Sequence, residues 1–151
     1  MPILYGDRGT VRVTRLQPTA AMFRARFTFE TDADGYACSS IPFTIQGTLI
    51  SYSSSCPIQD PPITGNYSVR LHDEWGVDQF DGLVTSLDAD GASDGPLYLD
   101  LDGSDRRRPL LVCNPARILF DRSATPPKAI VGVFDLYWTA RVQCPAPVPI
   151  M

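Results

Sequence analysis

The chain has 151 residues, which is enough for one domain that folds around its own core. Its 15 Asp against two Glu, 12 Arg against one Lys, 14 Pro and 11 Gly argue against a helix bundle, a coiled coil or a doubly wound α/β fold, because Glu and Lys favour helix surfaces whereas Asp favours turns. The hydrophobic fraction of 44% argues against disorder. The net charge of −4 divides into +3 over residues 1–30, −12 over 31–105 and +5 over 106–151, which is unlike the clustered basic surface of a nucleic-acid binder.

Alternation of apolar and polar residues predicts strands along most of the chain. The clearest case is residues 22–30, where Phe23, Ala25, Phe27 and Phe29 alternate with polar side chains. The same pattern predicts strands at residues 10–16, 43–52 (bulged at Gly47), 67–71, 80–87, 97–101, 110–113, 117–120 and 129–143.

The last of these strands has apolar residues on both faces. Ile130, Phe134 and Trp138 share one face, and Val131 and Tyr137 lie on the other. Because a strand that is apolar on both faces is typical of the middle of a sheet, we expect residues 129–143 to form a central strand.

Turn residues separate the predicted strands. Asp-Gly occurs five times, at residues 34–35, 81–82, 90–91, 94–95 and 102–103, and favours hairpins because both residues tolerate positive φ. Strands at intervals of about ten residues predict an all-β fold, an antiparallel β-sandwich or jelly roll of about eight strands with extended termini. We expect residues 10–143 to form this β-sandwich domain, residues 1–9 an N-terminal arm, and residues 144–151 a Pro-rich C-terminal tail that either frays or lies across a neighbouring subunit.

The cysteines and the N-terminus bear on the cellular compartment. The N-terminus lacks the features of a signal peptide, and no stretch approaches the roughly 18 apolar residues of a membrane helix, so we expect synthesis in a cytoplasm and no membrane partner. The four cysteines form no Cys-x-x-Cys pair and no zinc-site spacing; we expect free or core thiols, with one or two disulfides as the alternative outside a cell. They are Cys38, Cys56, Cys113 and Cys144.

Three acidic segments have the form Asp-x-Asp-Gly, at residues 32–35, 88–91 and 100–103. Clustered carboxylates bind Ca²⁺, and Asp100, Asp102 and Asp105 are the best candidates for such a site. None of the segments has the register of an EF-hand loop, however, and we favour the alternative that each Asp caps its own turn. The sequence therefore predicts no metal and no cofactor.

An enzyme is the least favoured class. His72 is the one imidazole base in the sequence, and its position just after a predicted strand favours exposure to solvent. The sequence has no Gly-x-Ser-x-Gly, Walker or Gly-x-Gly-x-x-Gly motif. The remaining enzymatic alternative, a weak one, is a glycosidase in which two Asp carboxylates come together in the fold.

Two other groups of residues are candidates for binding. Trp75 and Tyr98 are aromatic side chains suited to stacking on a sugar, as is Trp138, although its position in the longest strand favours a place in the core or an interface. Arg106 to Arg108 form the one basic run, predicted to be a solvated loop, with a contact to an acidic neighbour or to packaged nucleic acid as the alternative.

Several motifs resemble those of a known family. Residues 61–71 read Pro-Pro-Ile-Thr-Gly-Asn-Tyr-Ser-Val-Arg-Leu, residues 73–82 read Asp-Glu-Trp-Gly-Val-Asp-Gln-Phe-Asp-Gly, and residues 131–138 read Val-Gly-Val-Phe-Asp-Leu-Tyr-Trp. With these motifs, residues 43–138 resemble the small β-sandwich virion proteins of tailed bacteriophages. Those proteins tend to show Pro-x-x-Asn-Tyr, an alternating strand, Asp-x-x-Gly-x-Asp and a similar closing strand.

The resemblance implies a non-enzymatic structural protein. We expect a decoration, or cement, protein at the capsid surface of a virion assembled in the bacterial cytoplasm, homo-oligomeric, with the major capsid protein as partner. The basic flanks of the sequence should face this partner and the acidic turns should face solvent, with no specific binding of nucleic acid. The alternatives are a tail or head-fibre module that binds a host-surface ligand, and a head–tail joining component.

Overall fold

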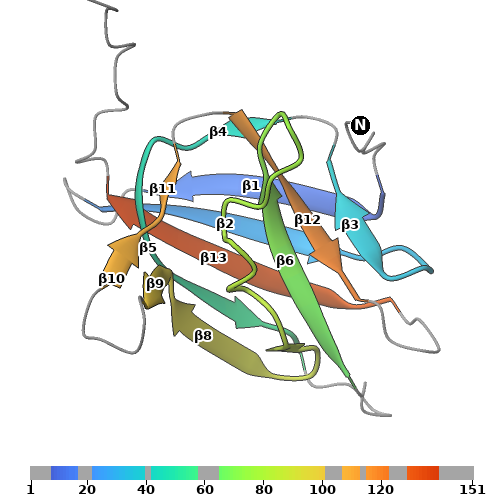
Figure 1. The fold of residues 1–151 in the computed structure, drawn as a ribbon. Helices are drawn as coiled ribbons and strands as arrows, with labels where there is room; N and C mark the ends of the chain where they lie inside the picture. Colours follow the sequence, from blue (N-terminus) through green and yellow to red (C-terminus); the bar gives the residue numbers. More distant parts are fainter. Residues whose placement is uncertain are drawn as a thin grey trace, which may run out of the picture.

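A computed structural model describes residues 8–16, 22–39, 42–57, 65–100, 107–112, 115–122 and 129–139 (Figure 1). These residues form an all-β fold of two packed antiparallel sheets, which confirms the predicted β-sandwich. The described residues contain no helix long and apolar enough to cross a membrane.

The larger sheet has six strands. Its order is β1 (Thr10–Leu16), β2 (Met22–Glu30), β13 (Val131–Thr139), β5 (Gly47–Ser55) and β11 (Leu111–Val112), and β8 (Ala92–Pro96) also pairs with β5. β13 pairs with β2 from Val131 to Thr139 and with β5 from Val133 to Thr139, so the prediction of a central strand is confirmed. Its outer face is more open than predicted, since Val131 is 43% exposed.

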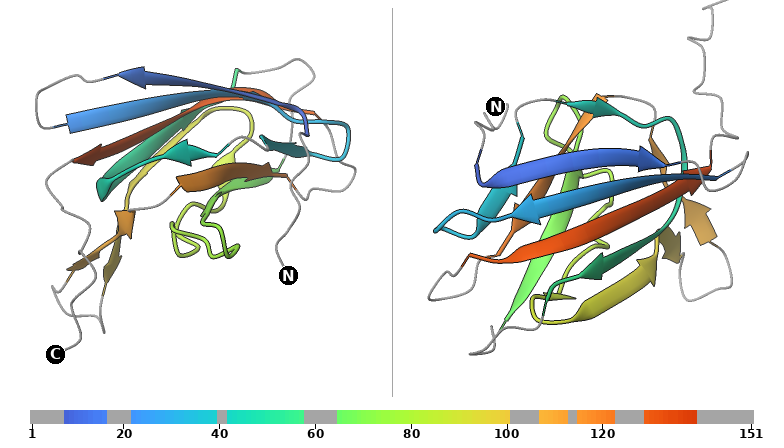
Figure 2. Two further views of the ribbon diagram at one scale, coloured as in Figure 1. Left: turned by 90° about the horizontal axis from the view of Figure 1, so that it is seen from above. Right: turned by 180° about the vertical axis from the view of Figure 1, so that it is seen from behind.

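The second sheet has five strands. Its order is β3 (Tyr36–Cys38), β12 (Pro115–Asp121), β6 (Asn66–His72) and β7 (Leu87–Asp88), and β4 (Phe43–Thr44) also pairs with β12. A separate two-stranded ribbon consists of β9 (Tyr98–Asp100) and β10 (Arg107–Pro109). Figure 2 shows the two sheets as layers, with this ribbon projecting at one end.

Aromatic rings fill the space between the sheets. Phe27 and Phe29 come from β2, Phe134 from β13 and Phe120 from β12, and all four are at most 1% exposed. Phe134 lies near the middle, with ring centroids 5.8 Å from Tyr52, 6.0 Å from Phe120 and 6.2 Å from Phe27 and Phe80. Burial of these large apolar surfaces supplies most of the stabilisation.

Several sequence predictions of strands are wrong. Residues 43–52 form two strands, β4 and β5, because the chain leaves one sheet at Phe43–Thr44 and enters the other at Gly47. Residues 80–86 form turns, in which Asp81 has φ 51° and Ser86 has φ 58°, and pairing resumes only at β7. The described residues contain thirteen strands, more than the predicted eight, because several have two or three residues.

Among the four Asp-Gly pairs within the described ranges, Asp94-Gly95 is the one that does not form a turn. It lies inside β8, where Gly95 pairs with Tyr52 of β5. A Cβ at residue 95 would lie 2.8 Å from the Tyr52 hydroxyl. The role of this glycine is therefore to let the tyrosine side chain approach the backbone closely, and it forms no turn.

The chain ends are outside the described part of the structure. Residues 1–7 of the predicted N-terminal arm and the whole tail, residues 144–151, are not described. Arg8 pairs with Cys38 through hydrogen bonds of 3.1 and 2.8 Å between their backbones, which attaches the end of the predicted arm to the sandwich.

Candidate functional site

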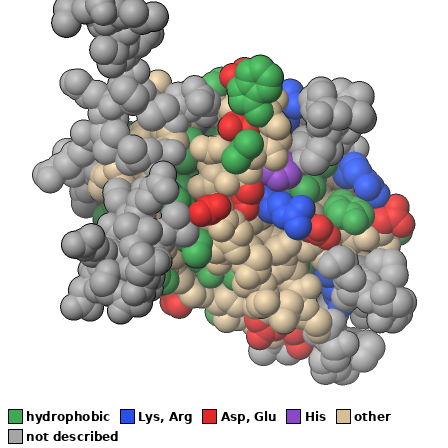
Figure 3. All heavy atoms as spheres, viewed as in Figure 1, with side chains coloured by type: hydrophobic (Ala, Val, Ile, Leu, Met, Phe, Trp, Pro, Cys, Tyr) green, Lys and Arg blue, Asp and Glu red, His purple; other side chains and the backbone are tan. Residues whose placement is uncertain are grey.

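The loop after β6 carries the two most exposed large hydrophobic side chains in the described ranges. Trp75 is 79% exposed and Val77 is 57% exposed. We call residues 73–80 the Trp75 loop. In Figure 3, hydrophobic side chains stand out from the surface in the region above β6, next to acidic side chains.

Asp73 organises the tip of the Trp75 loop. Its Oδ1 accepts hydrogen bonds of 2.9 Å from the backbone N–H groups of Trp75 and Val77. The Asp73 N–H donates to the Val77 carbonyl at 3.0 Å, and Gly76, at φ 79°, donates to the Asp73 carbonyl at 3.1 Å. An Asp that bonds the backbone two and four residues ahead closes a tight turn, and Gly76 adopts the left-handed conformation that this turn requires.

Asp78 fastens the base of the Trp75 loop to the sheet. Its Oδ1 accepts from the N–H groups of Leu71 at 3.0 Å and Phe80 at 3.1 Å, and its Oδ2 accepts from Gly82 at 3.0 Å. Phe80 is fully buried in the core. The loop is therefore fixed at both ends, although nothing in the described part of the chain covers its two apolar side chains.

A small pocket lies beside the Trp75 loop, with a volume of about 170 Å³. Its lining residues are mainly polar, and they come from β6, the loop itself, β12 and the segment before β4. They are Pro42, His72, Asp73, Glu74, Pro115 and Arg117. The Nε of Arg117 is buried and has no hydrogen-bond partner among the described residues.

The prediction that His72 faces solvent is wrong. It is 4% exposed, because it is the last residue of β6 and pairs with Arg117 of β12. Burial lowers the pKa of His72 below its ordinary value, and the positive charge of Arg70 acts in the same direction, against the carboxylates of Asp78 and Asp73. The imidazole is therefore neutral at physiological pH.

Two of the three Asp-x-Asp-Gly segments have the hydrogen bonds expected of turn caps. Asp32 accepts from the N–H groups of Asp34 and Tyr36 at 3.0 Å, and its other oxygen pairs with Arg8 at 2.8 Å. Asp88 accepts from the N–H of Asp90 at 2.9 Å. Over the described ranges, no three His, Cys, Asp or Glu side chains gather as metal ligands do; the side chain of Asp100 and residues 102 and 105 lie outside the description.

The remaining candidates fall into different surroundings. Trp138 is 4% exposed and stacks on Phe23 with ring centroids 5.7 Å apart, which confirms its predicted place in the core. Tyr98 is half-buried. Arg107 and Arg108 belong to strand β10, paired with β9, so the prediction of a loop is wrong for these two residues, while Arg106 is not described.

Cys38 and Cys56 are buried thiols, as predicted, and Cys113 and Cys144 lie outside the described residues. Burial raises the pKa of the Cys56 thiol, and it also raises the pKa of the neighbouring Tyr67 phenol. A nucleophilic cysteine needs the opposite shift, because the thiolate is the reactive form. Cys56 is therefore a core residue.

The chain was compared with protein-family models, with curated proteins and with solved structures, and none of them matches it.

Proposed function

We propose that the chain is a non-enzymatic virion protein of a tailed phage, and that it decorates the capsid surface as a cement protein. The observation that carries this proposal is the Trp75 loop, an exposed indole on a backbone held by Asp73 and Asp78. Tryptophan is enriched among the residues that dominate protein interfaces. A loop that is ordered before binding loses little conformational entropy when it docks.

In this proposal the indole of Trp75 enters a pocket on the major capsid protein, and Val77 packs beside it. The β-sandwich behind the loop spreads over the joint between capsid subunits. A capsid presents many identical sites, so a homo-oligomer of the chain gains affinity by engaging several of them at once.

Binding of the purified protein to capsids that lack it tests this proposal. Trp75→Ala should weaken binding by about 30-fold or more, the loss typical of an interface hot spot, and should remove the protection of capsids against heat. Val131→Ala is the matched control, because Val131 is also an exposed apolar residue but lies on the outer face of β13. Unchanged binding of Trp75→Ala would contradict the proposal.

One observation favours the alternative of a module that binds a host-surface glycan. The loop that carries the indole also contributes Glu74 to the polar pocket, which His72 and Arg117 line as well. Sugar-binding sites combine an aromatic platform with polar groups in this way. A glycan array separates the two functions. Arg117→Ala should abolish a glycan signal and leave capsid binding unchanged, whereas both activities depend on Trp75.

A further inference from the structure

The outer edge of β1 is a second surface, separate from the Trp75 loop. β1 pairs with β2 over its whole length, from Thr10 to Leu16, and no other described strand pairs with its opposite edge. Such an edge presents unpaired N–H and C=O groups that can hydrogen-bond another extended chain. It is seven residues long and contains no proline, so no residue type that blocks pairing interrupts it.

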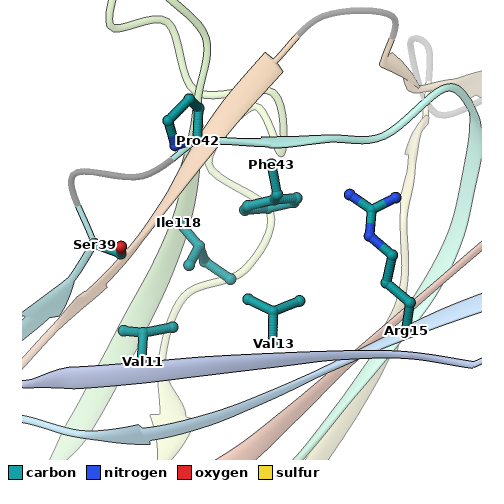
Figure 4. Close-up of a pocket in the computed structure, with 7 residues that line it drawn as sticks. All are labelled: Val11, Val13, Arg15, Ser39, Pro42, Phe43 and Ile118. Atoms are coloured by element: carbon teal, nitrogen blue, oxygen red, sulfur yellow. The ribbon is translucent and has the colours of Figure 1, made fainter.

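An apolar groove lies beneath this edge, with a volume of about 370 Å³ (Figure 4). Val11 and Val13 project from β1 toward Phe43 of β4 and Ile118 of β12, while the Arg15 side chain reaches across one end. Val13, which lines the groove, is 42% exposed. Its other lining residues are Ser39 and Pro42.

The charges of the edge point to the chemistry of an occupant. Arg12 and Arg15 are exposed, and neither forms an ion pair with a described residue. The other arginines of this part of the chain are paired: Arg8 with Asp32 and Asp34, and Arg24 and Arg26 with Asp135. The edge therefore offers two uncompensated cations, one on each face of β1, because residues three apart on a strand point to opposite faces.

We propose that the β1 edge and its groove bind an extended acidic segment of a partner protein by strand addition. In the antiparallel register, carboxylates of the segment face Arg12 and Arg15, and small apolar side chains face Val11 and Val13 over the groove. Backbone hydrogen bonds supply the affinity, and the alternating side chains supply the specificity. This surface contains no residue of the Trp75 loop, although Pro42 lines both the groove and the pocket beside that loop, so it gives the protein a second attachment point.

A designed peptide tests this proposal directly. The probe is acetyl-Thr-Glu-Thr-Val-Glu-Val-Thr-amide, whose first and second glutamates face Arg15 and Arg12 and whose valines face Val13 and Val11. The matched control replaces both glutamates by lysine. With the full chain, the glutamate peptide should bind at least about tenfold more tightly than the lysine peptide, and added salt should reduce this preference.

Charge reversal provides the decisive comparison. Arg12→Glu/Arg15→Glu should invert the preference between the two peptides, whereas Arg70→Glu, on an exposed residue of β6, should leave it unchanged. Hydrogen exchange of the β1 amides should slow when the glutamate peptide is bound. Binding that is insensitive to the charge reversal, or that leaves the β1 amides unprotected, overturns the proposal.

A second copy of the chain is the competing occupant, and sedimentation tests it. If the protein associates through β1 in the absence of peptide and the probe does not displace that association, the proposal is overturned. A monomer that acquires the peptide, or an association that the probe displaces, supports it.

Discussion

The ring of Phe29 stacks on the ring of Phe120 with centroids 4.0 Å apart and planes inclined by 13°. Phe29 belongs to β2 of the larger sheet and Phe120 to β12 of the second sheet. The pair therefore joins the two layers directly, and Tyr67 of β6 extends it with a ring centroid 5.5 Å from that of Phe29.

Substitution of this pair should destabilise the sandwich. Phe29→Leu and Phe120→Leu should each lower the free energy of unfolding by about 1–3 kcal/mol, because the lost ring surface leaves a cavity between the sheets. Chemical denaturation of both single variants and the double variant should give a coupling free energy between the two rings of about 0.5–1.5 kcal/mol. As a control, Phe43→Leu at the groove should lower the free energy of unfolding by less. If the losses from Phe29→Leu and Phe120→Leu are additive in the double variant, the stacked pair makes no direct contribution to stability.

Asp135 should contribute stability that depends on pH. It is 6% exposed and accepts hydrogen bonds from Arg24 at 2.6 Å and from Arg26 at 3.0 Å. Burial alone would raise the pKa of this carboxyl, but the hydrogen bonds and charges of Arg26 and Arg24 outweigh burial and lower it. Because the pKa is lower in the folded protein, this stabilisation is present above the ordinary carboxyl range and is lost as the pH falls through the folded pKa.

Asp135→Asn should therefore reduce the free energy of unfolding at pH 7 by about 1.5–3 kcal/mol. The difference between the variant and the natural protein should shrink in acid, as measured by denaturation at a series of pH values. Asp34→Asn, which breaks an exposed ion pair with Arg8, should have little effect at any pH. A difference that stays constant down to the lowest pH would contradict this account.

His72 should titrate below the ordinary histidine pKa of 6.5, because burial disfavours its charged form. It is the one histidine in the sequence, so a single imidazole signal in an NMR titration measures it without assignment. Because the pKa of His72 is lower in the folded protein than in the unfolded chain, the free energy of unfolding should fall as the pH drops below 6.5. In that range the unfolded chain binds a proton at His72 more readily than the folded protein does. A midpoint at or above 6.5 would contradict the burial of the ring.

Gly132 should resist any larger side chain. A Cβ at residue 132 would lie 2.8 Å from the Sγ of Cys56, 2.9 Å from the Phe29 ring and 3.0 Å from the Ser55 carbonyl. Gly132→Ala should therefore cost about 1–3 kcal/mol by overpacking, measured by thermal unfolding. Cys56→Ala removes one of the three obstacles, so the double variant should lose less than the sum of the two single variants.

The strands that the sequence predicts best are those with strong alternation and a solvated face. β1 and β2 have the predicted bounds because each alternates regularly and all of β1 pairs with residues 24–30 of β2. β8 was not predicted because four of its five residues, Ser, Asp, Gly and Pro, favour turns, and it is a strand only through its pairing with β5. Local propensity carries no information about that partner.

The residue types of the candidate site were predictable from the sequence, and the longest strand already favoured burial of Trp138. The degree to which Trp75 is exposed was not predictable, because it depends on the hydrogen bonds by which Asp73 and Asp78 hold the Trp75 loop. The two carboxylates, five residues apart with Gly between them, were a recognisable turn signal. The groove at β1 had no such signal, since β1, β4 and β12, whose residues line it, are far apart in the sequence.

The position of β13 has a consequence for the synthesis of the protein. β2 and β5 belong to one sheet, yet each pairs with β13 and neither pairs with the other. β13 is the last of the described strands in the sequence, so the ribosome must deliver residues 131–139 before the larger sheet can close. Until then, the edges of β2 and β5 that pair with β13 remain unpaired, so we expect nascent chains to be exposed to mispairing and the larger sheet to form late and cooperatively.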